Sequence, residues 1–175
     1  MSTVKHVEQI IAPPPFHMVG DGFKVHNFYP TLSMDRMSPF FLLDYNAKWN
    51  VPATEKPRGV GVHPHRGLET VTIAYKGKIA HHDSAGHADV INEGEVQWMT
   101  AGSGILHKEY HEKEFSKTGG ILQMVQLWVN LPAKEKFTPP MYQPISREQM
   151  GRYELPDKSG IVEVIAGKYM EIKGP

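Results

Sequence analysis

Two pairs of residues have the types and the spacing to bind a metal ion. His63 and His65 are separated by one residue, and so are His107 and Glu109. In a β-strand, residues i and i+2 face the same side, so each pair can direct both of its side chains toward one point. Two such pairs on neighbouring strands would supply three imidazoles and one carboxylate to a single metal ion.

The fourth ligand has two candidates on spacing alone. Glu109 is the strand neighbour of His107, whereas Glu69 follows His65 by four residues. Pro64, between the first two histidines, cannot donate a hydrogen bond to a neighbouring strand, so it favours an edge strand or a strand start for this segment. Spacing does not choose between the two carboxylates.

The other histidines of this region are expected to have different roles. His81, His82 and His87 belong to a polar segment that contains glycine, where histidines are usually solvated, and we expect none of them to be a ligand. His111 lies two residues beyond Glu109, and we expect the chain to be leaving the strand there.

Composition excludes several other classes of protein. The chain contains no cysteine, which removes disulfides, thiolate catalysis and cysteine-bound zinc or iron–sulfur clusters, so a metal must use His, Asp or Glu. Lys plus Arg and Asp plus Glu both number 19, and this balance disfavours direct binding to nucleic acid. No apolar run approaches the roughly 20 residues of a membrane span, and the first residues lack the apolar core of a signal peptide. We therefore expect a cytoplasmic protein with no membrane segment.

Short apolar segments interrupted by Gly, Pro, Asn and Asp predict an all-β fold, either a sandwich or a barrel. The expected strands are Lys24–Tyr29, Phe40–Tyr45, Glu69–Tyr75, Lys78–Asp83, Asp89–Asn92, Val96–Ala101, Ile105–Tyr110 and Ile121–Asn130. Three further expectations concern the last part of the chain: a connector at Leu131–Pro144, a short helix at Ser146–Met150, and strands at Ile161–Ile165 and Lys168–Ile172.

Longer motifs give the sequence a family resemblance. His63, His65, Glu69 and Gly77 resemble the first motif of the cupin superfamily. The strings HPHRGLETVT (63–72), QWMTAGSGILHKE (97–109) and QLWVNL (126–131) together resemble the pirin family over roughly Phe23–Gln143. The resemblance implies a jelly-roll-like cupin β-barrel.

The resemblance to pirins also implies a ligand set. It assigns His63, His65, His107 and Glu109 to one divalent metal and places Glu69 in the pocket wall, although in many other cupins the glutamate of the first motif is a ligand. Three imidazoles and a carboxylate suit iron(II), our first expectation, and also manganese, nickel, copper, cobalt or zinc.

Two functions from different classes follow from the resemblance. One is a quercetin 2,3-dioxygenase that cleaves a flavonol-like substrate with dioxygen, in which Glu109, or Glu69, is the catalytic base. The other is a non-catalytic, redox-responsive regulatory protein that acts through protein partners. A site that is vestigial or that holds adventitious metal is the third alternative.

The resemblance further implies a division of the chain. Pirins are usually two stacked cupin-like barrels, so we expect residues 1–135 to form the N-terminal barrel and residues 136–175 to be a connector and the start of a shortened second domain. A lone barrel would expose the apolar surface that normally meets its partner, and this predicts a homo-oligomer.

Overall fold

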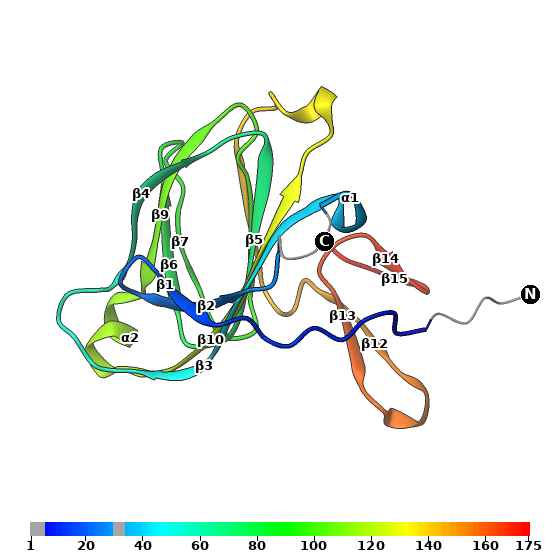
Figure 1. The fold of residues 1–175 in the computed structure, drawn as a ribbon, viewed down its shortest axis with the longest axis horizontal. Helices are drawn as coiled ribbons and strands as arrows, with labels where there is room; N and C mark the ends of the chain where they lie inside the picture. Colours follow the sequence, from blue (N-terminus) through cyan, green and yellow to red (C-terminus); the bar gives the residue numbers. More distant parts are fainter. Residues whose placement is uncertain (1–5, 30–33) are drawn as a thin grey trace, which may run out of the picture.

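The computed structural model describes residues 6–29 and 34–175 of the chain. Figure 1 shows a β-barrel with small hairpins at one side. In order across the sheet, the larger sheet contains β1 (Phe16–Val19), β2 (Phe23–Asn27), β3 (Phe40–Val51), β10 (Gly120–Asn130), β5 (Leu68–Lys76), β8 (Val96–Thr100) and β11 (Met141–Ile145). The facing sheet contains β4 (Gly59–His65), β9 (Ile105–His111), β6 (Ile79–Asp83) and β7 (Ala88–Ile91). The expected all-β fold is confirmed.

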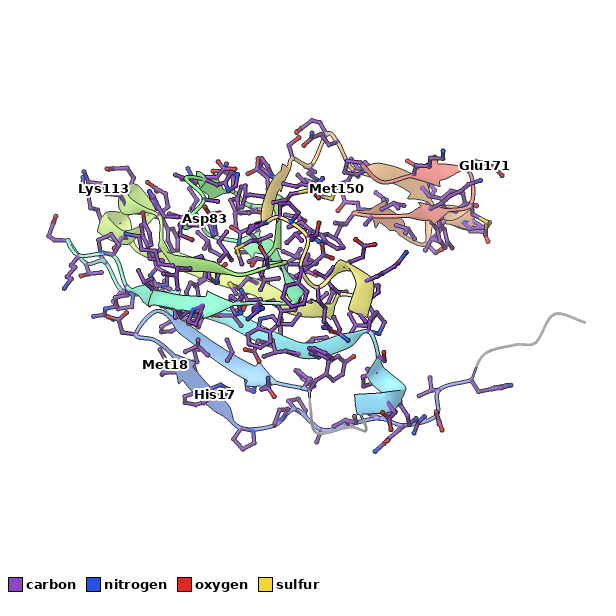
Figure 2. All side chains as sticks on the ribbon, turned by 90° about the horizontal axis from the view of Figure 1, so that it is seen from above. His17, Met18, Asp83, Lys113, Met150 and Glu171 are labelled. Carbon is purple, nitrogen blue, oxygen red and sulfur yellow. The ribbon has the colours of Figure 1, made fainter. Side chains whose placement is uncertain are left out.

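Short helices and hairpins complete the described chain. They are α1 (Met34–Met37), α2 (Lys113–Thr118), the 3-10 turns η1 (Ala133–Glu135) and η2 (Pro156–Lys158), and the hairpins β12 (Gly151–Glu154) with β13 (Ile161–Val164) and β14 (Lys168–Tyr169) with β15 (Ile172–Lys173). Figure 2 shows the last two hairpins extending from the barrel beyond Met150.

Side-chain alternation divides the interior of the barrel into an apolar end and a polar end. The apolar end is a buried cluster that joins both sheets: Phe23, Val25, Val51, Ala74, Ile79, Ile91, Leu122 and Met124. Along β9, Ile105, His107, Glu109 and His111 are all buried, because every second residue of the strand faces inward. Polar groups therefore gather inside the barrel beside a conventional core.

The outer face of the larger sheet is also partly covered. Val71 and Val96 on this face pack against Ile145 and Met150, and Ile165 from the C-terminal segment joins the same cluster. The last part of the chain thus contributes to the packing of the barrel sheet.

The structure differs from expectation in the segment after β10. Residues 131–144, expected as a connector, include η1 and most of β11, which pairs with β8 and extends the barrel sheet. The helix expected at Ser146–Met150 is wrong: this segment is a turn in which the Gln149 amide donates to the Ser146 carbonyl. The strand expected at Lys168–Ile172 is two short strands, β14 and β15, joined by a turn.

Candidate metal site

The edge of the smaller sheet brings the two histidine-containing segments together. Within residues 6–29 and 34–175, β4 is an edge strand that pairs with β9 alone in that sheet, which agrees with the position expected for Pro64. In the antiparallel register His63 lies directly opposite His107, and His65 lies opposite Ile105. Directly opposite and diagonal residues on one face of a strand pair are close enough for their side chains to touch.

Three of the predicted ligands converge. His63, His65 and His107 each offer a ring nitrogen, and these nitrogens all lie within 4.8 Å of one another. The centroid of the His107 ring is 4.4 Å from that of His63 and 4.8 Å from that of His65. Distances of this size leave room for one ion between the three rings.

Glu109 lies beside His107 on the inward face of β9, and its side chain is held by polar groups from the opposite sheet. Its Oε1 accepts hydrogen bonds from Gln97 Nε2 at 3.0 Å and Thr72 Oγ1 at 3.3 Å, and its Oε2 accepts one from Gln126 Nε2 at 2.9 Å. Glu109 also belongs to a second group of potential ligand atoms, with His81 and His107, that lie within 4.8 Å of one another. His107 is common to both groups.

The state of the histidines fits a divalent metal. Burial, followed by the nearby His107 and His63, lowers the pKa of His65 to about 4, and burial together with His63 and His81 lowers the pKa of His107 to about 3. Both rings are therefore neutral at neutral pH, which is the form that binds metals. In the described part of the chain His107 Nε2 is buried without a hydrogen-bond partner. An unpartnered imidazole nitrogen beside two other imidazoles is what a metal ligand requires.

The site opens into a pocket of about 660 Å³. The pocket is lined by polar and apolar side chains from both sheets and the N-terminal strands: His17, Val19, Asn27, Leu42, Asp44, Val60, His63, Pro64, His65, Glu109, Gln126 and Trp128. The indole of Trp128 meets the His65 ring edge to face, with centroids 4.9 Å apart. Burial raises the pKa of Asp44 even though Asn27 donates a hydrogen bond to its carboxyl.

Glu69, the alternative carboxylate, faces away from this pocket. Thr70 and Thr72 on the same strand point into the barrel, so the side chain of Glu69 leaves the opposite face of β5. There its Oε1 accepts a hydrogen bond from Thr100 Oγ1 at 2.6 Å. Glu69 is absent from the pocket lining and from both groups of potential ligands found in the described residues, so the geometry favours Glu109.

The prediction that His81 is solvated is wrong. Its side chain is fully buried on β6, 3.4 Å from His107 between the two Nδ1 atoms, and its Nε2 lies 3.2 Å from Asp83 Oδ2. Burial lowers the pKa of His81, so this ring is also neutral. Of its two neighbours, His82 is exposed and contacts Tyr110, and His87 is half-buried and contacts Asp83.

Asp83 organises the turn that follows β6. Burial raises its pKa, but hydrogen bonds from His87, His81 and Ala85 outweigh this effect and hold the pKa of Asp83 below its usual value. Figure 2 marks Asp83 among the side chains of the smaller sheet. Its carboxylate is therefore a fixed acceptor next to His81.

His111 has a structural role. β9 continues to His111, contrary to expectation, and the side chain is completely buried. Its Nε2 donates to the Gly22 carbonyl at 2.9 Å, and the ring packs edge-on against Phe23 and Phe115. Its contacts are thus with the apolar end of the barrel.

Sequence reasoning missed the residues that hold Glu109 and His81. Gln97 and Gln126 occupy inward positions of β8 and β10, and Tyr142 on β11 donates its hydroxyl to Gln97 Oε1 at 3.2 Å. The Tyr142 ring also stacks on His81, with centroids 4.6 Å apart. The pattern that could have identified the two glutamines is a polar residue at an inward position of an otherwise apolar strand.

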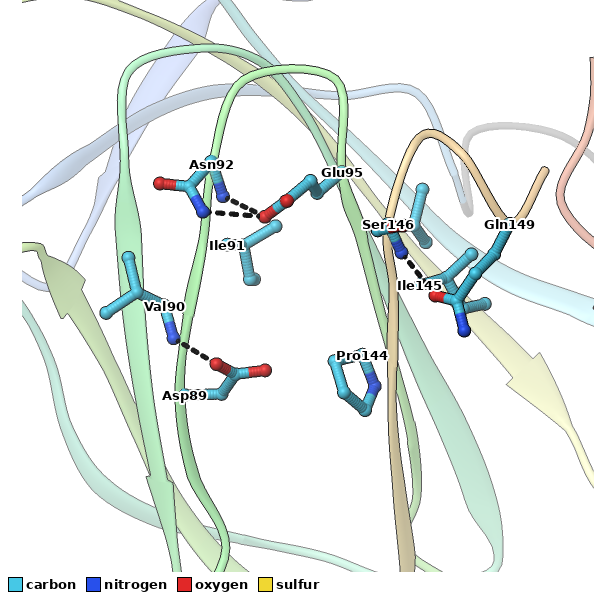
Figure 3. A pocket seen from close by; sticks show the side chains of 10 residues that line it. Asp89, Val90, Ile91, Asn92, Glu95, Pro144, Ile145, Ser146 and Gln149 are labelled. Carbon is cyan, nitrogen blue, oxygen red and sulfur yellow. Dashed lines mark hydrogen bonds between the residues drawn. The ribbon is translucent and has the colours of Figure 1, made fainter.

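A separate pocket of about 340 Å³ lies between β7, β8 and β11 (Figure 3). Its polar groups are engaged with one another: Asn92 donates to Glu95, the Val90 amide to Asp89, and the Ser146 amide to Gln149. None of its lining residues belongs to either histidine group.

The barrel and its inward histidines define a cupin-fold protein with a candidate metal centre. Residues 22–129, more than half of the chain, match the family described as Pirin. The chain therefore belongs to the pirin family. Among the residues that the structure describes, no helix is long and apolar enough to cross a membrane.

Relatives and solved structures support this membership. The chain is 53% identical over 161 residues to PA2418 of Pseudomonas aeruginosa, provisionally named a quercetin 2,3-dioxygenase, a match that covers 91% of this chain and 56% of that protein. It is 40% identical to Pirin-1 of Arabidopsis thaliana, over 89% of this chain and 50% of that protein. The chain thus spans about half the length of the curated relatives it matches.

Two solved structures extend the comparison. A quercetin 2,3-dioxygenase from Acinetobacter baumannii is 49% identical, with a TM-score of 0.86, over 93% of this chain and 57% of that one. The bacterial pirin YhhW from Escherichia coli, solved in complex with nickel(II), is 27% identical, with a TM-score of 0.53, over 69% of this chain and 49% of that one.

Proposed function

We propose that the chain is a metal-dependent oxidoreductase of the quercetin 2,3-dioxygenase type, which binds a flavonol-like substrate in the 660 Å³ pocket. The observation that carries the proposal is the convergence of His63, His65 and His107, with Glu109 close to His107 and lining the same pocket as His63 and His65. The dioxygenase names of the Pseudomonas and Acinetobacter proteins support the choice of reaction.

The proposed ligands are His63, His65, His107 and Glu109, with His81 as the alternative partner of His107 and Glu109. Neutral imidazoles and one carboxylate suit iron(II) first, and also manganese, nickel, copper, cobalt or zinc. When bound, such a metal supplies Lewis acidity toward the substrate oxygens and a site for dioxygen chemistry. The nickel(II) complex of YhhW supports a divalent metal in this family.

The pocket residues would bind and deprotonate the substrate. A planar aromatic molecule fits beside Trp128, Leu42 and Val60, and the volume lies within the usual range of ligand pockets, about 300–1,000 Å³. We propose that Glu109 accepts the proton of the flavonol hydroxyl. Gln97 and Gln126 hold the carboxylate in place for that transfer.

Metal content tests the ligand set. Purified wild-type chain should contain close to one divalent metal per molecule, and His63→Ala and Glu109→Gln should each lose most of it. Glu69→Gln is the matched control, because it changes a carboxylate outside the pocket and should retain the metal. Retention of metal by His63→Ala and loss in His81→Phe would replace this set with the group around His81.

Oxygen uptake tests the reaction. With quercetin, the metal-loaded wild-type chain should consume dioxygen. Glu109→Gln, assayed with enough added metal to fill its site, should lose at least about 100-fold in rate, as is typical for removal of a general base. Stoichiometric metal without any uptake would favour the regulatory alternative. Protein partners, self-association and a cytoplasmic location stay predictions.

A further inference from the structure

We propose that Asp83 and His81 form a hydrogen-bonded chain that fixes the tautomer of His107, so that its Nε2 is always the nitrogen presented to the metal. This role of Asp83 and His81 rests on the metal site proposed above. Neither residue would touch the metal or the substrate; both are positioning residues.

The direction of these hydrogen bonds is set at Asp83, whose side chain is completely buried. Its Oδ1 accepts the backbone amides of Ala85 at 2.9 Å and His87 at 3.0 Å, which can only donate. Its Oδ2 lies 2.9 Å from His87 Nδ1 and 3.2 Å from His81 Nε2. A carboxylate surrounded by four nitrogens acts as an acceptor toward all of them, so both imidazole nitrogens carry protons.

The position of the proton on His81 determines which nitrogen of His107 donates. The His81 ring is fully buried, stacked on Tyr142 and tilted against the His107 ring. Burial in this position opposes a charge more than the Asp83 carboxylate favours it, so the ring is neutral and carries a single proton. Because that proton lies on Nε2, the Nδ1 of His81 is an acceptor. The nitrogen 3.4 Å away, His107 Nδ1, must then donate.

As a result, His107 Nε2 is left unprotonated. With the proton on Nδ1, Nε2 has a free lone pair, and this is the nitrogen that lacks a hydrogen-bond partner in the described chain. A second ring nitrogen anchored to a carboxylate or a carbonyl is the usual way in which proteins orient a histidine ligand. Here a second histidine lies between the carboxylate and the ligand. The same proton keeps the Nδ1 atoms of His81 and His107 from binding one ion together.

The direct test is the tautomer of His107 in the metal-free protein, read from long-range proton–nitrogen correlation spectra of the histidine rings. The wild-type chain should show His107 protonated at Nδ1 and His81 protonated at Nε2. In Asp83→Asn, the side-chain carbonyl can still accept the turn amides, but its NH2 would face His81 Nε2. Both rings should then reverse, with His107 protonated at Nε2.

Metal affinity gives an independent readout. Titration of the metal-free protein with cobalt(II) should show Asp83→Asn weakened by about 10- to 100-fold, the usual range for residues that orient a metal ligand. The matched control is His82→Gln, which alters the adjacent, exposed histidine and should leave both the tautomer and the affinity unchanged.

Because Asp83 also holds the turn, His81→Phe provides a second test with the turn intact. Phenylalanine keeps the stacking on Tyr142 but removes the acceptor, so His107 should become a mixture of tautomers and cobalt(II) affinity should fall. Protonation of His107 at Nε2 in the wild type, or an unchanged His107 tautomer in folded Asp83→Asn and His81→Phe, would overturn the proposal. Failure of the wild-type chain to bind cobalt(II), with the tautomers as expected, would instead count against the proposed metal site.

Discussion

At the scale of single residues, burial keeps the imidazoles of the candidate site neutral, and this makes the free energy of unfolding depend on pH. His65 and His107 have pKa values of about 4 and about 3, well below the ordinary value of 6.5 that they regain on unfolding. At a pH between the folded pKa and 6.5, each of these histidines is protonated in the unfolded chain but not in the folded chain. Stability must therefore fall as the pH falls through this window.

We predict that the metal-free protein loses stability between pH 7 and pH 5, before most carboxylates titrate. For His65 the loss would reach about 3 kcal/mol once the pH falls to its folded pKa, since one pKa unit corresponds to about 1.4 kcal/mol. Urea unfolding at a series of pH values measures it. His65→Asn should flatten the dependence, whereas the exposed His82→Gln should not. A dependence equally steep in His65→Asn would contradict this assignment.

At the scale of strands, β11 connects the site to a part of the chain beyond the segment that matches the family. Tyr142, on β11, donates to Gln97 Oε1, and this contact directs the Gln97 amide nitrogen toward Glu109. Burial raises the pKa of Tyr142, so its hydroxyl stays protonated and remains a donor. Residues 22–129 carry the proposed ligands, but β11 contributes to their support.

We predict that Tyr142→Phe weakens metal binding by about fivefold, the equivalent of one hydrogen bond of about 1 kcal/mol. The phenyl ring keeps the stacking on His81, so the change isolates the hydroxyl. Competition between the protein and a chelating indicator measures the affinity. Tyr110→Phe is the matched control, because it removes a tyrosine–histidine contact outside the pocket. An equal loss in both variants would show that the effect is not specific to Gln97.

Strand patterns predicted the inward position of the candidate ligands better than the position of the residues that contact them. The i, i+2 spacing was enough to predict His63, His65 and His107 on inward faces, because alternation depends only on the strand. The burial of His81 could not be predicted in the same way, since its neighbours His82 and Asp83 are polar and a glycine turn follows. β11 was missed because Pro139 and Pro140 precede it and Pro144 lies within it, a composition typical of a connector. α2 was missed because its N-cap is Glu112, an uncommon N-cap residue that accepts from the amides of Glu114 and Phe115.

At the scale of the whole molecule, the C-terminal segment is packed on the barrel. Met150 and Ile165 pack on the outer face of the larger sheet, against Val71, Val96 and Ile145. This packing reduces the apolar surface that a lone barrel was expected to expose. The division of the chain near residue 135 stays a prediction, and β11 crosses beyond it to pair with β8.

We predict that Met150→Ala destabilises the protein by about 2–5 kcal/mol, the range for truncating a buried methionine. Met150 is 6% exposed and belongs to the cluster on the outer face, so its truncation would leave a cavity on the side of the sheet opposite the candidate metal site. Urea unfolding measures the change, and metal content should be unaffected. Met141→Ala, at a half-exposed position, is the control. An unchanged midpoint for Met150→Ala would mean that the C-terminal segment unfolds separately from the barrel.

The edge position of β4 gives the site a mechanical meaning. Among the described residues β4, like β7 at the other edge, pairs with a single strand of the smaller sheet, and Pro64 removes one donor from β4, so local opening of the sheet can begin there. His63 and His65 lie on this edge strand, whereas His107 and Glu109 lie on the inner strand next to it. A metal bound by all four residues would link β4 to β9. Occupancy of the site and closure of the barrel edge would then be one equilibrium, shifted by the concentration of free metal.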